Sequence, residues 1–138
     1  MKKTPRQKRA SAKKRAKKDA VDAMSLYIRN RDNWTCYTCG IHGDKYTMDN
    51  GHLITASRSG TQFHEKNCHC QCKPCNIKHE DDYEPYRRKF VEQYGEAYYD
   101  EMYAASWEVM NYTTEDYREL EEYFKNKLAE LQMEQIDD

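Results

Sequence analysis

Two Cys-x-x-Cys pairs constrain the fold of this chain more than any other feature. They are Cys36-Tyr-Thr-Cys39 and Cys72-Lys-Pro-Cys75, and 32 residues lie between them. Two residues between thiolates allow one tight turn to direct both sulfurs at the same ion, so two such turns supply the four ligands of a tetrahedral zinc site. Gly40 follows the first pair and permits a tight backbone turn there. The pattern predicts a closed structural zinc site that joins two distant segments.

The remaining composition agrees with a small domain that a metal stabilises. The chain has 138 residues, of which 34% are charged and 38% hydrophobic, so its core is small. No segment has the features of a secretion signal or a membrane-spanning helix, and we therefore expect a protein of the cytoplasm. In that reducing compartment six cysteines favour metal binding over disulfides. Cys68 and Cys70 break the Cys-x-x-Cys spacing and are expected to be spare.

Charge is strongly segregated along the chain. Residues 1–31 contain twelve Lys and Arg against two acidic residues, residues 32–79 are nearly neutral, and residues 80–138 have a net charge of −12. Such a basic segment is typical of a chain that binds a polyanion, although an idle solvated tail has the same composition. The candidate DNA contacts in this segment are Lys13, Lys14, Arg15, Lys17 and Lys18.

These patterns divide the chain into three regions. Residues 1–20 are expected to form a basic arm that is largely disordered on its own, because like charges four apart repel along a helix. Residues 21–82 are expected to form the zinc-stapled core, and residues 83–138 an acidic helical extension for packing or dimerisation. The fold class predicted is α+β.

Helix caps and periodicity predict the individual elements. A first helix is expected to end near Arg31, and Asn50-Gly51 predicts a turn that divides residues 46–54 into a short hairpin. Residues 55–62 are expected to form a loop. The helices predicted after the core begin near Asn76 and then span Glu84–Gln93, Glu96–Met110 and Thr113 to about Gln135.

Three polar positions lie between the cysteine pairs or directly after the second pair. His52 ends the segment Asp49-Asn50-Gly51-His52, Asn67 stands five residues before Cys72, and Asn76 follows Cys75 directly. An isolated Asn-Gly-His is most often a turn with a surface histidine. The residues alone leave both a surface turn and a catalytic histidine open.

This arrangement resembles the HNH, or ββα-metal, nucleases. In that family a strand ends on a histidine, a loop carries an Asn five residues before a Cys-x-x-Cys, and the next helix opens with an Asn or His that binds metal. Within it the chain is most similar to the phage NinG/Rap recombination nucleases, over roughly residues 24–103, and more distantly to the phage junction resolvase endonuclease VII. The matching stretches are Tyr27-Ile-Arg-Asn-Arg-Asp32, Cys36-x-x-Cys39-Gly40, Asp49-x-Gly-His52, Ser57-Arg58-Ser59, Phe63-x-Glu65-x-Asn67-x-His69, Gln71-Cys-Lys-Pro-Cys-Asn76, Tyr86-Arg87 and Gln93-Tyr-Gly95.

The resemblance implies a fold and a role for each residue of the site. It implies a ββα-metal (HNH) core with a basic N-terminal helix or arm and a C-terminal helical region. His52 would be the general base, and Asn67 would hold the His52 ring through a hydrogen bond. Asn76 would bind a catalytic Mg²⁺ or Mn²⁺.

The second ligand of that ion is less directly implied. Many members of the superfamily have an acid or histidine just before the base, where this chain has Gly51. Asp49 would then reach the ion if Gly51 allows a bulge. His79 and Glu80 follow Asn76 on the same helical face and could also bind the ion. Arg58 would grip the DNA backbone.

The function implied is a metal-dependent DNA endonuclease of branched recombination intermediates, of the Holliday-junction or D-loop type. Its products would have 5′-phosphate and 3′-hydroxyl ends. Two alternatives remain: an HNH nicking or homing-type nuclease of duplex DNA, and a zinc-stapled nucleic-acid-binding module without catalysis. The partner expected is DNA and not a membrane, and symmetric cutting of two strands would favour a homodimer. A phage-encoded chain would work in the host-cell cytoplasm.

Overall fold

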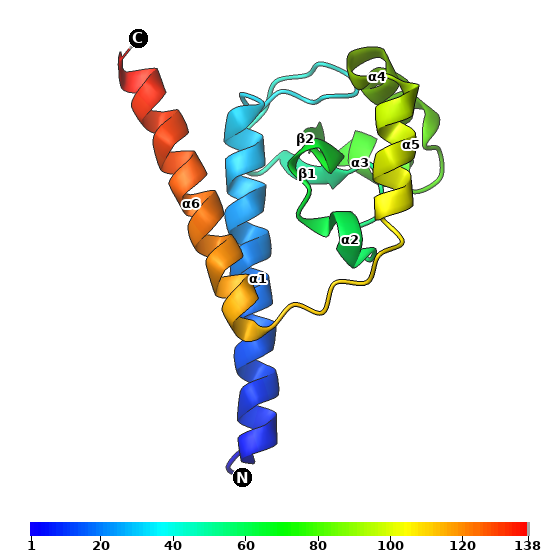
Figure 1. Cartoon of the computed structure of the whole chain (residues 1–138). Coiled ribbons are helices and arrows are strands. Elements are labelled where there is room, and N and C mark those ends of the chain that lie inside the picture. The colour runs from blue at the N-terminus through cyan, green and yellow to red at the C-terminus, as the bar shows by residue number, and fades with distance from the viewer. Residues whose placement is uncertain (138) are drawn as a thin grey trace. The chain divides into compact units, whose positions relative to one another are not determined.

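Two structural units make up the chain in a computed structural model, which describes residues 1–137 (Figure 1). One unit comprises Met1–Tyr27 together with the chain from Asn111 onward, and the other comprises Ile28–Met110. The fold is mixed α+β, as predicted, with a single two-stranded sheet among the described residues. No helix in residues 1–137 combines the length and the apolar character needed to cross a membrane.

The first unit pairs helix α1 (Pro5–Arg31) with helix α6 (Thr114–Asp137). Both helices begin with a reciprocal cap. Thr4 Oγ1 accepts from the Gln7 N–H at 3.1 Å, while the Gln7 side chain accepts from the Thr4 N–H at 2.8 Å. Thr113 and Asp116 exchange the same two bonds at the start of α6, at 3.1 and 2.8 Å. These caps satisfy backbone N–H groups that a helix start otherwise leaves without partners.

The basic segment is helical in the full chain, as part of α1, and its disorder on its own stays a prediction. Ala16 and Ala20 are wholly buried, and Tyr27 and Phe124 lie with ring centroids 6.1 Å apart across α1 and α6. This packing of an apolar face stabilises the helix against the repulsion between its lysines and arginines. The acidic helix α6 adds an ion pair between Arg118 and Asp19 at 2.9 Å.

The second unit is built on strands β1 (Met48–His52) and β2 (Cys68–Cys72), which pair antiparallel. The pairing runs without interruption from Met48 opposite Cys72 to His52 opposite Cys68. The predicted turn at Asn50-Gly51 and the predicted bulge at Gly51 are therefore wrong, because both residues lie inside β1. Gly51 instead permits a close approach, since a Cβ there would overlap the Gln71 side chain.

Four helices and a 3₁₀ turn surround this sheet. They are α2 (Ser59–Gln62), η1 (Glu65–Asn67), α3 (Lys73–His79), α4 (Glu84–Tyr94) and α5 (Glu96–Ala105). Gly95 ends α4 with φ +90°, as its sequence position predicts, whereas α5 ends at Ala105 and not at Met110.

The core of this unit consists of residues from the chain after β1, from α4 and from α5. They are Leu53, Ile54, Tyr86, Phe90 and Met102. Because α4 and α5 pack on this core, they belong with the Ile28–Met110 unit and only α6 belongs with α1. The boundaries thus differ from the 1–20, 21–82 and 83–138 division expected from charge.

Candidate functional site

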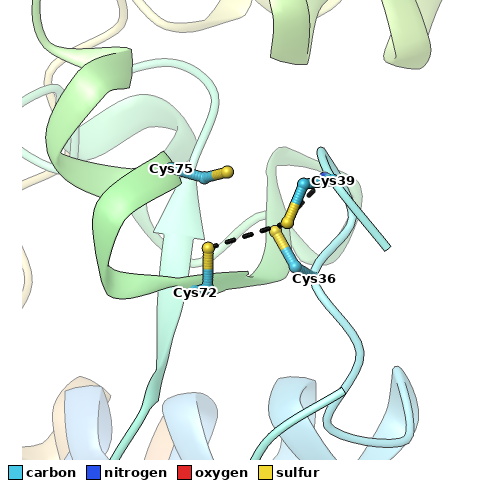
Figure 2. Close-up of side chains that lie close together, drawn as sticks. All are labelled: Cys36, Cys39, Cys72 and Cys75. Atoms are coloured by element: carbon cyan, nitrogen blue, oxygen red, sulfur yellow. Dashed lines mark hydrogen bonds between the residues drawn. The ribbon is translucent and has the colours of Figure 1, made fainter. Parts of the chain in front are cut away.

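The four cysteines of the two Cys-x-x-Cys pairs converge on one point (Figure 2). Their sulfur atoms all lie within 4.8 Å of one another, and Cys39 Sγ is 3.8 Å from Cys72 Sγ. A tetrahedral ion with Zn–S distances of about 2.3 Å requires sulfurs about 3.8 Å apart. In residues 1–137 this is the one cluster of three or more His, Cys, Asp or Glu that could hold a metal. The donor set and its spacing fit zinc.

Local backbone geometry explains how the two pairs aim their sulfurs. In the first pair, the Gly40 N–H donates to the Cys36 carbonyl at 2.9 Å, and Gly40 has φ +81°. In the second pair, Cys72 ends β2 and caps α3, so Cys75 lies in the first turn of that helix. A zinc ion would therefore fasten the Cys36–Cys39 turn to the junction of β2 and α3.

The environment of the thiols also suits a cation. Burial raises the pKa of Cys36, but backbone N–H groups, that of Cys39 first among them, lower it to about 7 overall. The Cys39 N–H lies 3.5 Å from the Cys36 sulfur. Burial raises the pKa of Cys75, and the side chains of Cys72 and Cys39 raise it further. Four adjacent thiolates need a divalent ion to be stable together.

Cys68 and Cys70 lie outside this cluster, on the buried strand β2. Burial raises the pKa of Cys70 to about 12 and raises that of Cys68 as well. Both side chains are thus neutral thiols of the core, in agreement with their expected role as spare cysteines.

His52 stands at the end of β1 with its imidazole in a fixed orientation. Its Nε2 lies 2.9 Å from the carbonyl oxygen of Gln62. A carbonyl can only accept, so Nε2 bears the proton and Nδ1 keeps its lone pair. Burial lowers the pKa of His52 below its usual 6.5. The ring is therefore neutral at pH 7 and able to accept a proton at Nδ1.

Asn67 does not hold the His52 ring by a side-chain hydrogen bond, and this part of the expectation needs correction. The wholly buried Asn67 amide accepts from the Ile54 N–H at 2.8 Å and donates to the carbonyls of Ile54 and Thr61, at 2.9 and 3.1 Å. It thus ties the chain after β1 to α2. Since Thr61 precedes Gln62, Asn67 positions the carbonyl that orients His52. A backbone acceptor leaves no signal in a sequence, so Gln62 could not be foreseen.

Asp49 and Asn76 lie in contact, because the Asn76 amide donates a hydrogen bond to the Asp49 carboxylate. Asn76 Nδ2 is 3.2 Å from Asp49 Oδ2, and Lys73 Nζ is 2.7 Å from Asp49 Oδ1. Successive side chains of a strand point to opposite faces, and three residues span about 10 Å. Asp49 and His52 therefore project from opposite faces of β1, and the structure does not place them on one surface.

His79 and Glu80 do not form a three-ligand group with Asp49 in the described part of the chain. His79 is buried, and its Nε2 donates to the Leu53 carbonyl at 2.7 Å. Glu80 is exposed. His79 therefore fastens the end of α3 to the chain that follows β1.

The candidate DNA contacts are placed in two different units. On α1, the five residues Lys13, Lys14, Arg15, Lys17 and Lys18 are all exposed, while Ala16 and Ala20 are buried. In the second unit Arg58 lies just before α2, next to the segment that holds His52. Its guanidinium stacks on the Trp107 ring at 3.7 Å and donates to Ser106 Oγ at 3.0 Å.

Gly60 allows α2 to pack closely against the backbone at the end of α5, and a larger residue there is expected to destabilise the protein. A Cβ at Gly60 would overlap the carbonyl oxygen of Ala105 and lie 2.7 Å from that of Glu108. Backbone oxygens cannot rotate away, so Gly60→Ala is expected to lower the free energy of unfolding by about 1–3 kcal/mol in urea denaturation. The exposed Ala56→Ser on the same loop is the control. Equal stability of the two variants would contradict this packing.

Residues 1–134 match the family model described as the bacteriophage lambda NinG protein. The chain is also 30% identical, over 116 residues, to proteins named ninG from Escherichia phage 933W and from Enterobacteria phage VT2-Sa. Each match covers 83% of this chain and 57% of the relative, so the chain spans little more than half the length of these relatives. No solved structure matches the chain. The chain belongs to the bacteriophage lambda NinG protein family.

Proposed function

We propose that the chain is a metal-dependent endonuclease that cuts branched DNA recombination intermediates and leaves 5′-phosphate and 3′-hydroxyl ends. The observation that supports this most directly is the state of His52. Its Nε2–H is bound to the Gln62 carbonyl at 2.9 Å, and burial keeps the ring neutral. A neutral imidazole with a directed Nδ1 is a general base that can take a proton from water.

The order of elements supports an HNH core. Strands β1 and β2 pair with each other, with α2 and η1 between them in the chain, and β2 passes directly into α3 at Cys72, where the cysteine cluster lies. This is the β-β-α sequence of the nucleases that the chain resembles. In this proposal the zinc is structural, because four cysteines leave no open position for a substrate.

Asp49 and Asn76 are the residues that would hold the catalytic ion. Carboxylate and amide oxygens are ligands that Mg²⁺ accepts, and the contact between these two side chains brings both groups to one place. When bound, such an ion stabilises negative charge on the phosphate and on the leaving oxygen. His52 takes the proton of the attacking water, while Asn67 maintains the loop that orients its ring.

The basic helix α1 would supply affinity for the DNA backbone. Its exposed lysines and arginines give salt-dependent binding to phosphates whatever the base sequence. The buried face of α1 is used by the packing of this unit, so binding leaves its fold intact.

A cleavage assay with three DNA substrates tests the proposal. In Mg²⁺ the full chain is expected to nick a four-way junction and a flap faster than a plain duplex of the same sequence, and EDTA should stop the reaction. Preferential cutting of the duplex would instead support a nicking or homing-type nuclease. Asp49→Ala should slow junction cleavage at least tenfold and weaken Mn²⁺ binding, because it removes the charged ligand.

Asp100→Ala, an exposed acid on α5, is the matched control for this variant and should cut like the wild type. If Asp49→Ala cuts the junction at the rate of this control, Asp49 is not a ligand of the catalytic ion.

Two observations favour a second candidate, a zinc-stapled DNA-binding module without catalysis. Asp49 is already neutralised by Lys73, and Asp49 and His52 project from opposite faces of β1. This candidate predicts one bound zinc, no second divalent ion and no cleavage of any of the three substrates. The same assay, with metal analysis of the purified protein, separates the two functions.

A further inference from the structure

Two exposed aromatic rings and an arginine form a surface beside α2, the helix whose Gln62 carbonyl contacts His52. Tyr103 lies near the end of α5 and Trp107 just after it, and their side chains are 41% and 62% exposed. Arg58 lies over both rings, 3.7 Å from the centroid of Trp107 and 5.1 Å from that of Tyr103. We call these three residues the Arg58–Trp107 platform.

The platform is held rigidly in place. Gly60 lies against the backbone of Ala105 and Glu108, where any Cβ would collide. The Met110 N–H donates to Ser59 Oγ at 2.8 Å, and Arg58 donates to Ser106 Oγ at 3.0 Å. These contacts fix the segment after α5 to the segment that contains Arg58, so little conformational freedom remains to be lost when a ligand binds.

The large exposure of Trp107 has no explanation within the folded unit. A tryptophan ring normally buries most of its area in a core, and here more than half of the side chain faces solvent. Arg58 brings a cation to an otherwise acidic segment, since residues 96–110 contain no Lys or Arg. Within residues 1–137, the guanidinium of Arg58 makes a single hydrogen bond, to Ser106, so further N–H donors of Arg58 remain for a phosphate.

These features point to one chemical class of ligand. An aromatic ring beside a guanidinium stacks on the face of a nucleobase, while the same cation attracts the adjoining phosphate. In a plain duplex the base faces are covered by neighbouring pairs, whereas at a branch some of them are open. We propose that the Arg58–Trp107 platform binds an unpaired nucleobase of branched DNA.

The location of the platform connects it with the proposed cleavage site, and in this respect the inference rests on the proposed function. Arg58 and Gln62 are four residues apart, so their Cα atoms are at most about 14 Å apart. The Gln62 carbonyl orients His52. A base on the platform would thus select DNA with an open branch point close to the proposed base His52.

Binding measurements with three probes test the inference without requiring cleavage. The probes are an oligothymidine single strand, a duplex, and a four-way junction, all at one salt concentration. Trp107→Ala is expected to weaken binding of the single strand about 5- to 150-fold, the equivalent of about 1–3 kcal/mol for one stacked base. Affinity for the duplex should change less than twofold. Trp107→Phe, which keeps a ring, should retain most of the affinity.

Val109→Ala is the matched control, because Val109 is a still more exposed residue two positions along the same segment. It should bind all three probes like the wild type. Unchanged thermal melting and zinc content in each variant would show that the fold is intact. Equal loss of affinity for single strand and duplex, or no loss, would overturn the inference. Loss of self-association in Trp107→Ala with unchanged DNA affinity would overturn it too.

The outcomes also distinguish this inference from the proposed function. A protein that binds the single strand through Trp107 but cuts no junction supports the platform and contradicts the endonuclease. A protein that cuts the junction with the same affinity after Trp107→Ala supports the endonuclease and contradicts the platform.

Discussion

Cys39→Ala is expected to release the zinc and unfold the Ile28–Met110 unit. Cys39 is exposed, so its truncation removes little packing and acts through the lost ligand. Structural zinc contributes about 10–16 kcal/mol to the folding of small zinc-binding peptides. Whole domains are stable by only about 5–15 kcal/mol, so the unit does not tolerate loss of a large part of this contribution. Circular dichroism and metal analysis of the purified variant measure both effects.

Cys68→Ala provides the contrasting control. Cys68 is wholly buried but lies outside the four-cysteine cluster. Its replacement removes one small core group and should cost about 1 kcal/mol while one zinc per chain remains bound. Replacement of the exposed Cys39 is thus expected to lower the stability of the unit far more than replacement of the buried Cys68. If Cys39→Ala stays folded with a full zinc complement, the four-cysteine site is wrong.

The four-cysteine cluster could be predicted from the sequence because the geometry of each Cys-x-x-Cys pair is local. Two residues between cysteines make one turn, so each pair directs two sulfurs to the same side, and the fold brings the two pairs together. The C-terminus of α4 and the N-terminus of α6 were predictable for the same reason, since Gly95 and the Thr113–Asp116 cap act within a few residues. Local signals of this kind are strong enough to survive tertiary packing.

Features that depend on distant partners could not be predicted in this way. Asn50-Gly51 is a strong turn signal, yet both residues lie inside β1. The Gln71 side chain of β2 packs where a Cβ of residue 51 would lie, so this position favours glycine. Likewise Asn67 is separated from His52 by the intervening Thr61–Gln62 backbone. Both outcomes depend on contacts between residues that lie from six to twenty positions apart, which periodicity and spacing do not record.

The helical state of the basic segment has a similar origin. Its lysines and arginines repel one another, which argues for disorder in isolation. Burial of Ala16 and Ala20 in the unit shared with α6 overrides that repulsion. The alternation of small apolar and cationic residues was visible in the sequence, but the partner helix lies about a hundred residues away.

His52→Ala is expected to reduce junction cleavage in Mg²⁺ by about 10²–10⁴-fold while junction binding stays within twofold. The loss has the size usual for removal of a general base. His52 contacts the Gln62 carbonyl and is not among the exposed cations of α1 that would bind phosphates. His42→Ala is the matched control, because His42 is an exposed histidine of the same unit and should leave cleavage unchanged. Full cleavage by His52→Ala would exclude the assigned base.

The pH dependence of cleavage provides an independent check on the same residue. A general base acts in its neutral form, which predominates above its pKa. Burial lowers the pKa of His52 below 6.5, so the neutral form persists to a more acidic pH than in a free histidine. The cleavage rate of the wild type should therefore be level around pH 7 and begin to fall, by up to about tenfold per pH unit, only below pH 6.5. In His52→Ala this acidic decline should disappear from the residual rate. A decline that begins above pH 6.5 in the wild type would show that another group, in a different environment, supplies the base.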